Sequence, residues 1–137
     1  MSDINNDIRA ALESHLNAAN LADIAWENVS YSPTTGTKFI KTVYTPTTRR
    51  PSVMGLSPQQ RYDGLFRVLC HAAEGSGPKE ADDLATSVIQ LFEATSDIDY
   101  TGSQTVRVSI DFAERRIAFV DNPWYIVPVN ISWYTYK

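Results

Sequence analysis

The segment 124–136 reads WYIVPVNISWYTY, and its pattern indicates the kind of fold that this chain adopts. Apolar residues recur at every second position, which is the period of a β-strand, at Tyr125, Val127, Val129, Ile131 and Trp133. Aromatic rings also occupy intervening positions, so both faces of the strand are apolar. Such a strand either has both faces covered within the domain or meets another chain on one face, and the residues leave these alternatives open. Pro128 cannot donate to a hydrogen-bond ladder, which predicts an edge position or a bulge there.

Other stretches of the chain, all N-terminal to this segment, also have the composition of strands. The clearest alternation of apolar and polar residues is at Val106, Val108, Ile110 and Phe112. A short partner follows at 117–120, before a turn at 121–123. Farther toward the N-terminus, β-branched and aromatic residues predict strands at 24–29, 39–44 and 61–71.

Two segments have the spacing of helices. Residues 4–19 carry apolar side chains at helical intervals, and Asp7 lies where the helix dipole favours negative charge. A second helix is predicted from Pro78, which suits a first helical position, with a buried stripe at Ala81, Leu84, Ala85, Val88, Leu91 and Phe92. The predicted order is therefore α-β-β-β-α-β-β-β. We expect a single α+β domain over residues 1–137, with a mostly antiparallel sheet of about five to six strands packed with two helices.

The stretch 45–60 follows neither period and contains three prolines and Gly55. We expect a long mobile loop there, because loops of more than about 12–15 residues in a small domain are usually functional or disordered. Arg49 and Arg50 lie within it. These two arginines are therefore candidate contacts for a partner that orders the loop on binding.

A search for catalytic and cofactor-binding patterns indicates a non-enzymatic protein. The short 74–78 segment lacks the lysine and glycine spacing of a phosphate-binding loop. Cys70 and His71 are neighbours on a predicted strand, so they point to opposite faces and are expected to be a core cysteine and a surface histidine. With one cysteine and two histidines, no metal-ligand spacing is present, and no cofactor is expected.

The two carboxylate pairs have an ordinary structural explanation. Asp82 and Asp83 fall in the first turns of the second helix, where the helix dipole favours acids. Asp97 and Asp99 read as part of a solvated loop. Acid–base catalysis by paired carboxylates would need a cleft and separated pKa values, and the sequence indicates neither.

Composition narrows the class of protein further. The 43% hydrophobic and 20% charged residues are ordinary for a globular domain, and a net charge of −4 argues against bulk binding to nucleic acid. The single cysteine excludes an internal disulfide. No apolar run approaches the ~20 residues of a membrane span, and the polar N-terminus is not the signal peptide of a secreted protein. We therefore expect no membrane partner.

Charge is segregated along the chain. Residues 38–67 carry several bases against one acid, Asp63, whereas residues 74–99 carry seven acids against one base, Lys79. The two regions either pair within one subunit or form a head-to-tail contact in which the basic side of one copy meets the acidic side of the next. The residues hypothesised to form interfaces are Arg49, Arg50, Arg61, Arg67, Asp82, Asp83, Trp124 and Trp133.

Several segments, in order along the chain, resemble a known family. These are the opening helix with Ile8-Arg9-Ala10-Ala11-Leu12-Glu13, then 25–29 and 33–37, then Gly64-Leu65-Phe66-Arg67-Val68 followed by 73–77, and finally Trp124-Tyr125-Ile126-Val127-Pro128-Val129-Asn130-Ile131. Together they resemble phage tail-terminator-like proteins of the lambda minor tail protein U type, from long-tailed bacteriophages. The match covers most of the chain, and the loop 45–60 matches least.

The resemblance implies a structural virion protein, made in the host cytoplasm, that forms a hexameric ring on the tail tube. Such a ring ends tube polymerisation and provides the surface for head–tail joining. The implied partners are other copies of the chain, the tail tube protein and a head–tail completion or neck protein, while DNA passes through the lumen without specific binding. The alternatives are another phage neck subunit, such as a connector, and a binding module outside virion assembly.

Overall fold

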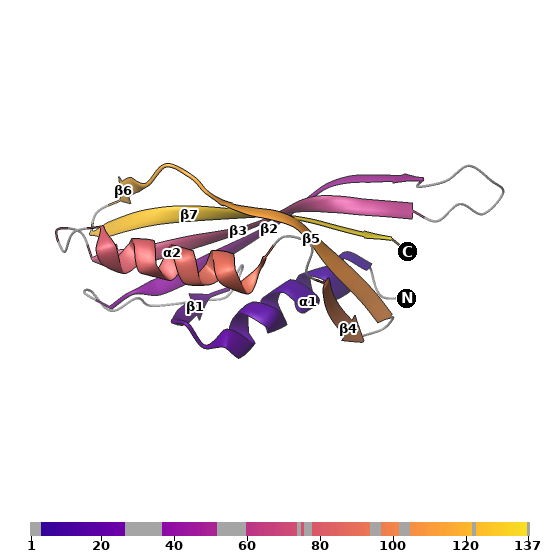
Figure 1. Ribbon diagram of the computed structural model, residues 1–137, viewed down its shortest axis with the longest axis horizontal. Coiled ribbons are helices and arrows are strands. Elements are labelled where there is room, and N and C mark those ends of the chain that lie inside the picture. The colour runs from indigo at the N-terminus through magenta and orange to yellow at the C-terminus, as the bar shows by residue number, and fades with distance from the viewer. Residues whose placement is uncertain are drawn as a thin grey trace.

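The computed structural model describes residues 4–26, 37–51, 60–73, 75, 78–93, 97–101, 105–121 and 123–136. The helices are α1 (Ile4–Ala19) and α2 (Lys79–Leu91). The strands are β1 (Asp23–Ala25), β2 (Phe39–Pro51), β3 (Gln60–Ala73), β4 (Asp97–Thr101), β5 (Thr105–Arg115), β6 (Phe119–Asp121) and β7 (Trp124–Tyr136). They form one sheet in the order β1-β2-β3-β7-β5-β4, and β6 pairs with β7. Both helices lie against the same side of this strongly twisted sheet (Figure 1).

The predicted α+β class and the order of helices and strands are confirmed, with two differences. The sheet is mixed, because β1 runs parallel to β2 while the other pairs are antiparallel. In addition, the segment with Asp97 and Asp99, which reads as a loop in the sequence, forms strand β4. β4 turns only Ile98 and Tyr100 toward the core side, and so short an alternation gives little signal in a sequence.

The helices bury the apolar stripes that their spacing predicts. Ile8, Leu12 and Leu16 of α1 are fully buried. In α2, the buried residues are Ala81, Leu84, Ala85 and Val88. α2 begins one residue later than predicted, with Pro78 as the residue that caps it and accepts a hydrogen bond from the Asp82 N–H at 2.9 Å. His15 Nε2 lies 3.0 Å from the Leu91 carbonyl and ties the two helices together.

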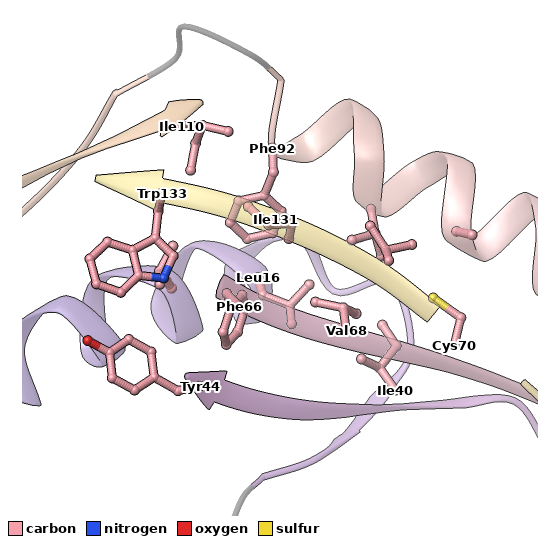
Figure 2. Packing of buried hydrophobic residues seen from close by; sticks show 14 of the residues in the cluster. Leu16, Ile40, Tyr44, Phe66, Val68, Cys70, Phe92, Ile110, Ile131 and Trp133 are labelled. Carbon is pink, nitrogen blue, oxygen red and sulfur yellow. The ribbon is translucent and has the colours of Figure 1, made fainter. Parts of the chain in front are cut away.

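The core lies between the helices and the sheet, and Trp133 is its largest fully buried side chain. The indole stacks on Tyr44 of β2 with ring centroids 5.6 Å apart and planes 9° apart (Figure 2). Gly64 of β3 lies beside Trp133 and opposite Pro46 in the strand register. A Cβ atom at Gly64 would lie 2.8 Å from Trp133 Cζ2 and 2.9 Å from the Pro46 Cα, so a side chain there has no room.

The predicted loop 45–60 is wrong over 45–51 and at Gln60, which belong to β2 and β3. β1 pairs only with Phe39–Lys41, so the rest of β2 has no described strand on its other side. An edge strand tolerates prolines, since their missing N–H groups can face away from the ladder. A bulge between Pro46 and Thr48 also interrupts the register. Residues 52–59 of the predicted loop are outside the described residues.

Pro128 is not on an edge strand, because β7 lies between β3 and β5. On the side of β5 and β6, however, the ladder is interrupted at this point. β5 pairs with β7 as far as Val129, and β6 begins its pairing at Ile126. The Pro128 carbonyl accepts a hydrogen bond from the Arg116 N–H at 2.9 Å. The chain crossing from β5 to β6 therefore replaces the ladder where the proline has no N–H to donate.

Candidate interaction surface

The side of the sheet opposite α1 and α2 is called the outer face. Strand alternation assigns residues to it: in β3 the inward residues Phe66, Val68 and Cys70 are fully buried with the helices, and their neighbours point outward. No described helix covers the outer face (Figure 1). For a protein without a recognisable catalytic pattern, this uncovered sheet face is the principal candidate for contact with other molecules.

Arg61 is the centre of an ordered polar and aromatic cluster on the outer face. Its Nη1 donates to the Tyr136 hydroxyl at 3.0 Å, and its Nε lies 3.3 Å from Asp63 Oδ2. The guanidinium also lies 4.6 Å from the centroid of the Tyr134 ring. Partial burial lowers the pKa of Arg61, but the hydrogen bonds to Tyr136 and Asp63 outweigh burial and raise it above its ordinary value. Arg61, Asp63, Tyr134 and Tyr136 are called the Arg61 cluster below.

The other basic residues of the predicted interface are distributed along β2 and β3. Arg67 is half-buried and donates through Nε to Asn130 Oδ1 at 3.2 Å across the β3–β7 pair. Arg49 and Arg50 belong to β2, where they are in register with Tyr62 and Arg61. The predicted basic residues therefore occupy two adjacent strands at one side of the sheet.

Trp124 packs inside its own chain. Its indole lies edge-on to Phe39 at 4.9 Å and to His71 at 6.2 Å between ring centroids, and Ile126 joins this small outer cluster. His71 is therefore buried, which corrects the prediction of a surface histidine; it stacks on Phe39 at 4.2 Å. Burial lowers the pKa of His71, although its Nδ1 also lies 3.0 Å from the Leu69 carbonyl. Trp133 is 1% exposed in the main core, so it is not on a reachable surface.

The predicted acidic residues of α2 have partners within the chain. Asp82 forms an ion pair of 2.8 Å with Arg115 of β5, and Asp83 forms one of 2.7 Å with Lys79. Neither of these ion pairs joins the acidic region 74–99 to the basic region 38–67. Within the described residues, Arg61 is joined to Asp63 of its own strand instead.

Four exposed apolar residues lie along β5, β6 and the crossing between them, and the sequence pattern does not indicate them all. They are Phe112, Ile117, Phe119 and Val120, with Ile117 91% exposed. Phe112 continues the alternation of Val106, Val108 and Ile110, which predicts an inward side chain. A bulge between Ile110 and Phe112 shifts the register by one residue and turns Phe112 to the outer face.

The described residues offer little for catalysis or cofactor binding. Cys70 is buried in the core, and burial raises the pKa of its thiol to about 12, so it is a poor nucleophile. Among the described residues, no three His, Cys, Asp or Glu side chains are grouped closely enough to hold a metal ion. None of the described helices is both long and apolar enough to cross a membrane.

The sheet separates charge more clearly than the sequence does. On one side of β7, the strands β1, β2 and β3 carry Lys41, Arg49, Arg50, Arg61 and Arg67 against Asp23 and Asp63. From 97 to 121, across β4, β5 and β6, the charged residues are Asp97, Asp99, Asp111, Glu114 and Asp121 against Arg107, Arg115 and Arg116. β7 carries no charged residue and lies between the two groups. We call them the basic half and the acidic half of the sheet.

Comparison with known proteins identifies the family of this chain. A solved structure superposes on all of this chain and 96% of its own with a TM-score of 0.73 at 20% identity; its name gives no function, and the likeness shows the fold alone. No curated protein sequence matches. The model of one family, described as phage tail terminator protein, matches residues 7–133. The chain therefore belongs to the phage tail terminator protein family and is a structural protein of a phage tail.

Proposed function

We propose that this protein caps the tail tube as a ring, ends polymerisation of the tube and provides the surface for head–tail joining. The proposal rests on family membership together with one structural observation: both described helices cover the same side of the sheet, and none of the described segments outside the sheet is a helix on its outer face. A subunit that acts only by contact with other subunits needs such a surface. The Arg61 cluster on that face has the residue types that are enriched at interface hot spots, arginine and tyrosine.

The proposed mechanism is selective contact. A tube grows because each added ring offers the next one a matching face. A terminator binds the last ring but presents a different face outward, so no further tube subunit fits and growth stops. The same outward face then receives the head–tail completion or neck protein. DNA crosses the lumen without specific binding, for which the overall net charge of −4 is suited, because it does not favour adhesion to phosphate.

A length assay tests this function. Purified tube protein of the same phage would be polymerised with increasing amounts of the full chain, and tube lengths and ends would be examined by negative-stain electron microscopy. We expect tubes whose growth stops once a ring of this protein covers one end. Tubes that keep growing at saturating concentration, with bare ends, would contradict the proposal.

The same assay separates a terminator from another neck subunit. A connector or completion protein would leave tube growth unchanged and would bind only to finished tails or to heads. A binding module outside virion assembly would bind neither. Each candidate thus gives a different pattern of tube length and end occupancy.

A further inference from the structure

Both lateral edges of the sheet are open in the described part of the chain. β4 forms one edge and pairs only with β5. At the opposite edge, β1 covers β2 only over Phe39–Lys41, which leaves Thr42–Pro51 without a neighbour among the described strands. An open edge presents backbone N–H and C=O groups in a row, which is a template for pairing with another chain. One sheet therefore offers two sites where a strand can be added.

The two edges carry opposite charge. The open stretch of β2 contains Arg49 and Arg50, in the basic half of the sheet. β4 contains Asp97 and Asp99, both exposed, in the acidic half. Arg107 pairs with Asp99 at 2.7 Å, whereas Asp97 accepts a hydrogen bond from the neutral Ser109 hydroxyl at 2.7 Å, so β4 keeps an acidic character. A second copy of the chain is thus a partner whose edge has the complementary charge.

The stretch of β2 between its two prolines is similar in length to β4. Pro46 and Pro51 have no N–H to donate, and they bracket the four residues of β2 that include both arginines. β4 has five residues and no proline. A pairing of four or five residues is short, and the prolines prevent it from extending along β2 into the uncontrolled edge pairing that leads to aggregation.

We propose that the open edge of β2 in one copy pairs with β4 of the next copy, and that this head-to-tail contact between the basic and acidic edges closes the ring. The contact rests on the proposed function as a ring. Because the two surfaces differ, each subunit uses one edge for each neighbour, and the rotation from copy to copy closes a cycle. Opposite charges select β4 rather than a second β2 edge, since two basic edges repel each other.

Charge reversal on each edge tests the contact with the full chain alone, without tube or neck protein. The first variant is R49E/R50E and the second is D97K/D99K. The assay is sedimentation velocity or native mass spectrometry over a wide range of concentration, with circular dichroism to verify folding. We expect each variant alone to lose self-association by on the order of a hundredfold, because like charges then face each other.

Combining the variants gives the decisive result. In an equimolar mixture, the acidic β4 edge of the first variant matches the basic β2 edge of the second, and the reversed β2 edge of the first matches the reversed β4 edge of the second. The mixture should therefore recover assembly, as rings of alternating unlike subunits. The variant with all four substitutions has the wild-type net charge and two reversed edges that again match. It should recover ring formation.

A matched control uses Lys41, in the covered part of the same strand, and Lys38, just before the strand begins. K38E/K41E makes the same change in net charge as R49E/R50E, but Lys41 is opposite β1 and its edge is already occupied. We expect this control to assemble like the wild type. E80K changes a carboxylate on α2 and none on either edge strand, and it serves the same purpose for the acidic side.

The outcomes separate the contact from the function. Rings that form equally well in both edge variants, while the wild type still caps tubes, overturn this contact and leave the proposed function standing. A wild-type chain that neither self-associates nor covers tube ends overturns both. Failure of the fourfold variant to recover assembly, although it is folded, also overturns the pairing of these two edges.

Discussion

Substitution of Gly64 by alanine tests how closely β2, β3 and β7 pack around Trp133. The added methyl would collide with the Thr45 carbonyl oxygen, Trp133 Cζ2 and the Pro46 Cα. Two of these three atoms belong to the β2 backbone, so they cannot be relieved by a change of rotamer. The indole cannot retreat either, because it is fully buried and stacked on Tyr44. Overpacking of this kind costs about 1–3 kcal/mol, and the backbone clash indicates the upper end.

A smaller opposing effect comes from the unfolded chain. Alanine restricts the unfolded state and so favours folding by about 0.4–1 kcal/mol where the native backbone is compatible. The net loss in the free energy of unfolding is therefore expected to be about 2 kcal/mol. For a domain of this size that corresponds to a decrease in Tm of roughly 6–8 °C. Chemical denaturation and thermal unfolding by circular dichroism measure both quantities.

A double-mutant cycle identifies the cause of the loss. W133F removes Cζ2, so the G64A substitution should cost roughly 1 kcal/mol less in that background. G75A is the contrasting glycine: Gly75 has φ of +88° and no atom within 4 Å of the position that a Cβ would take, so its cost is backbone strain and should not depend on Trp133. A free energy of unfolding that is unchanged by G64A, within about 0.5 kcal/mol, would refute this account of the packing.

Two further predictions follow from the basic half and from His71. Charge reversal at Arg49 and Arg50 should abolish tail joining in a complementation assay while circular dichroism remains that of the wild type; normal tail assembly by R49E/R50E would count against any role of these arginines at an interface. For His71, burial lowers the pKa in the folded state below its unfolded value near 6.5, so its contribution to stability is complete above about pH 6.5 and is lost as the pH falls toward the folded pKa. The free energy of unfolding should therefore decrease between about pH 7 and pH 5. The variant H71F has no imidazole to protonate, so its free energy of unfolding should decrease less over the same range. An identical pH dependence in the two proteins would exclude His71 as the cause.

Periodicity predicts the central elements well because packing determines them. β7, β3 and the two helices have long apolar patterns, and each buries most of the residues that its period indicates. The family resemblance, too, is carried by these segments, and the match to the family model covers residues 7–133. Where an element is long and lies in the core, its apolar pattern is sufficient to predict which of its faces is buried.

The sequence is less informative where pairing or register decides the structure. Phe112 lies outward because of a single bulged residue, and a one-residue shift in a strand exchanges its two faces. Pro128 is tolerated in a central strand because the β5–β6 crossing interrupts the ladder beside it, which depends on the position of another segment. Strand β2 continues past Pro46 because no described strand covers its other side there. Each of these features depends on a neighbouring strand that local composition does not reveal.

The interface residues, too, could not be assigned from local composition alone. Trp133 and Trp124 are interface candidates by residue type, but both are needed to fill clusters within the subunit. Tyr134 and Tyr136 have similar composition and lie on the outer face because of their register with β3. Arg61 can be named from charge alone, but its contacts with Tyr134, Tyr136 and Asp63 require the fold.

The division of the sheet into a basic half and an acidic half also bears on when subunits assemble. At physiological ionic strength, charges are screened beyond about 8 Å, so the opposite edges of two copies attract each other only when they are almost touching. At longer range each copy meets a neighbour of the same net charge, −4, which keeps a dilute free pool dispersed. In such a pool, assembly awaits a template that holds several copies side by side. Under the proposed function, a finished tube end supplies that template, and we expect the cap to form there before it forms in dilute solution.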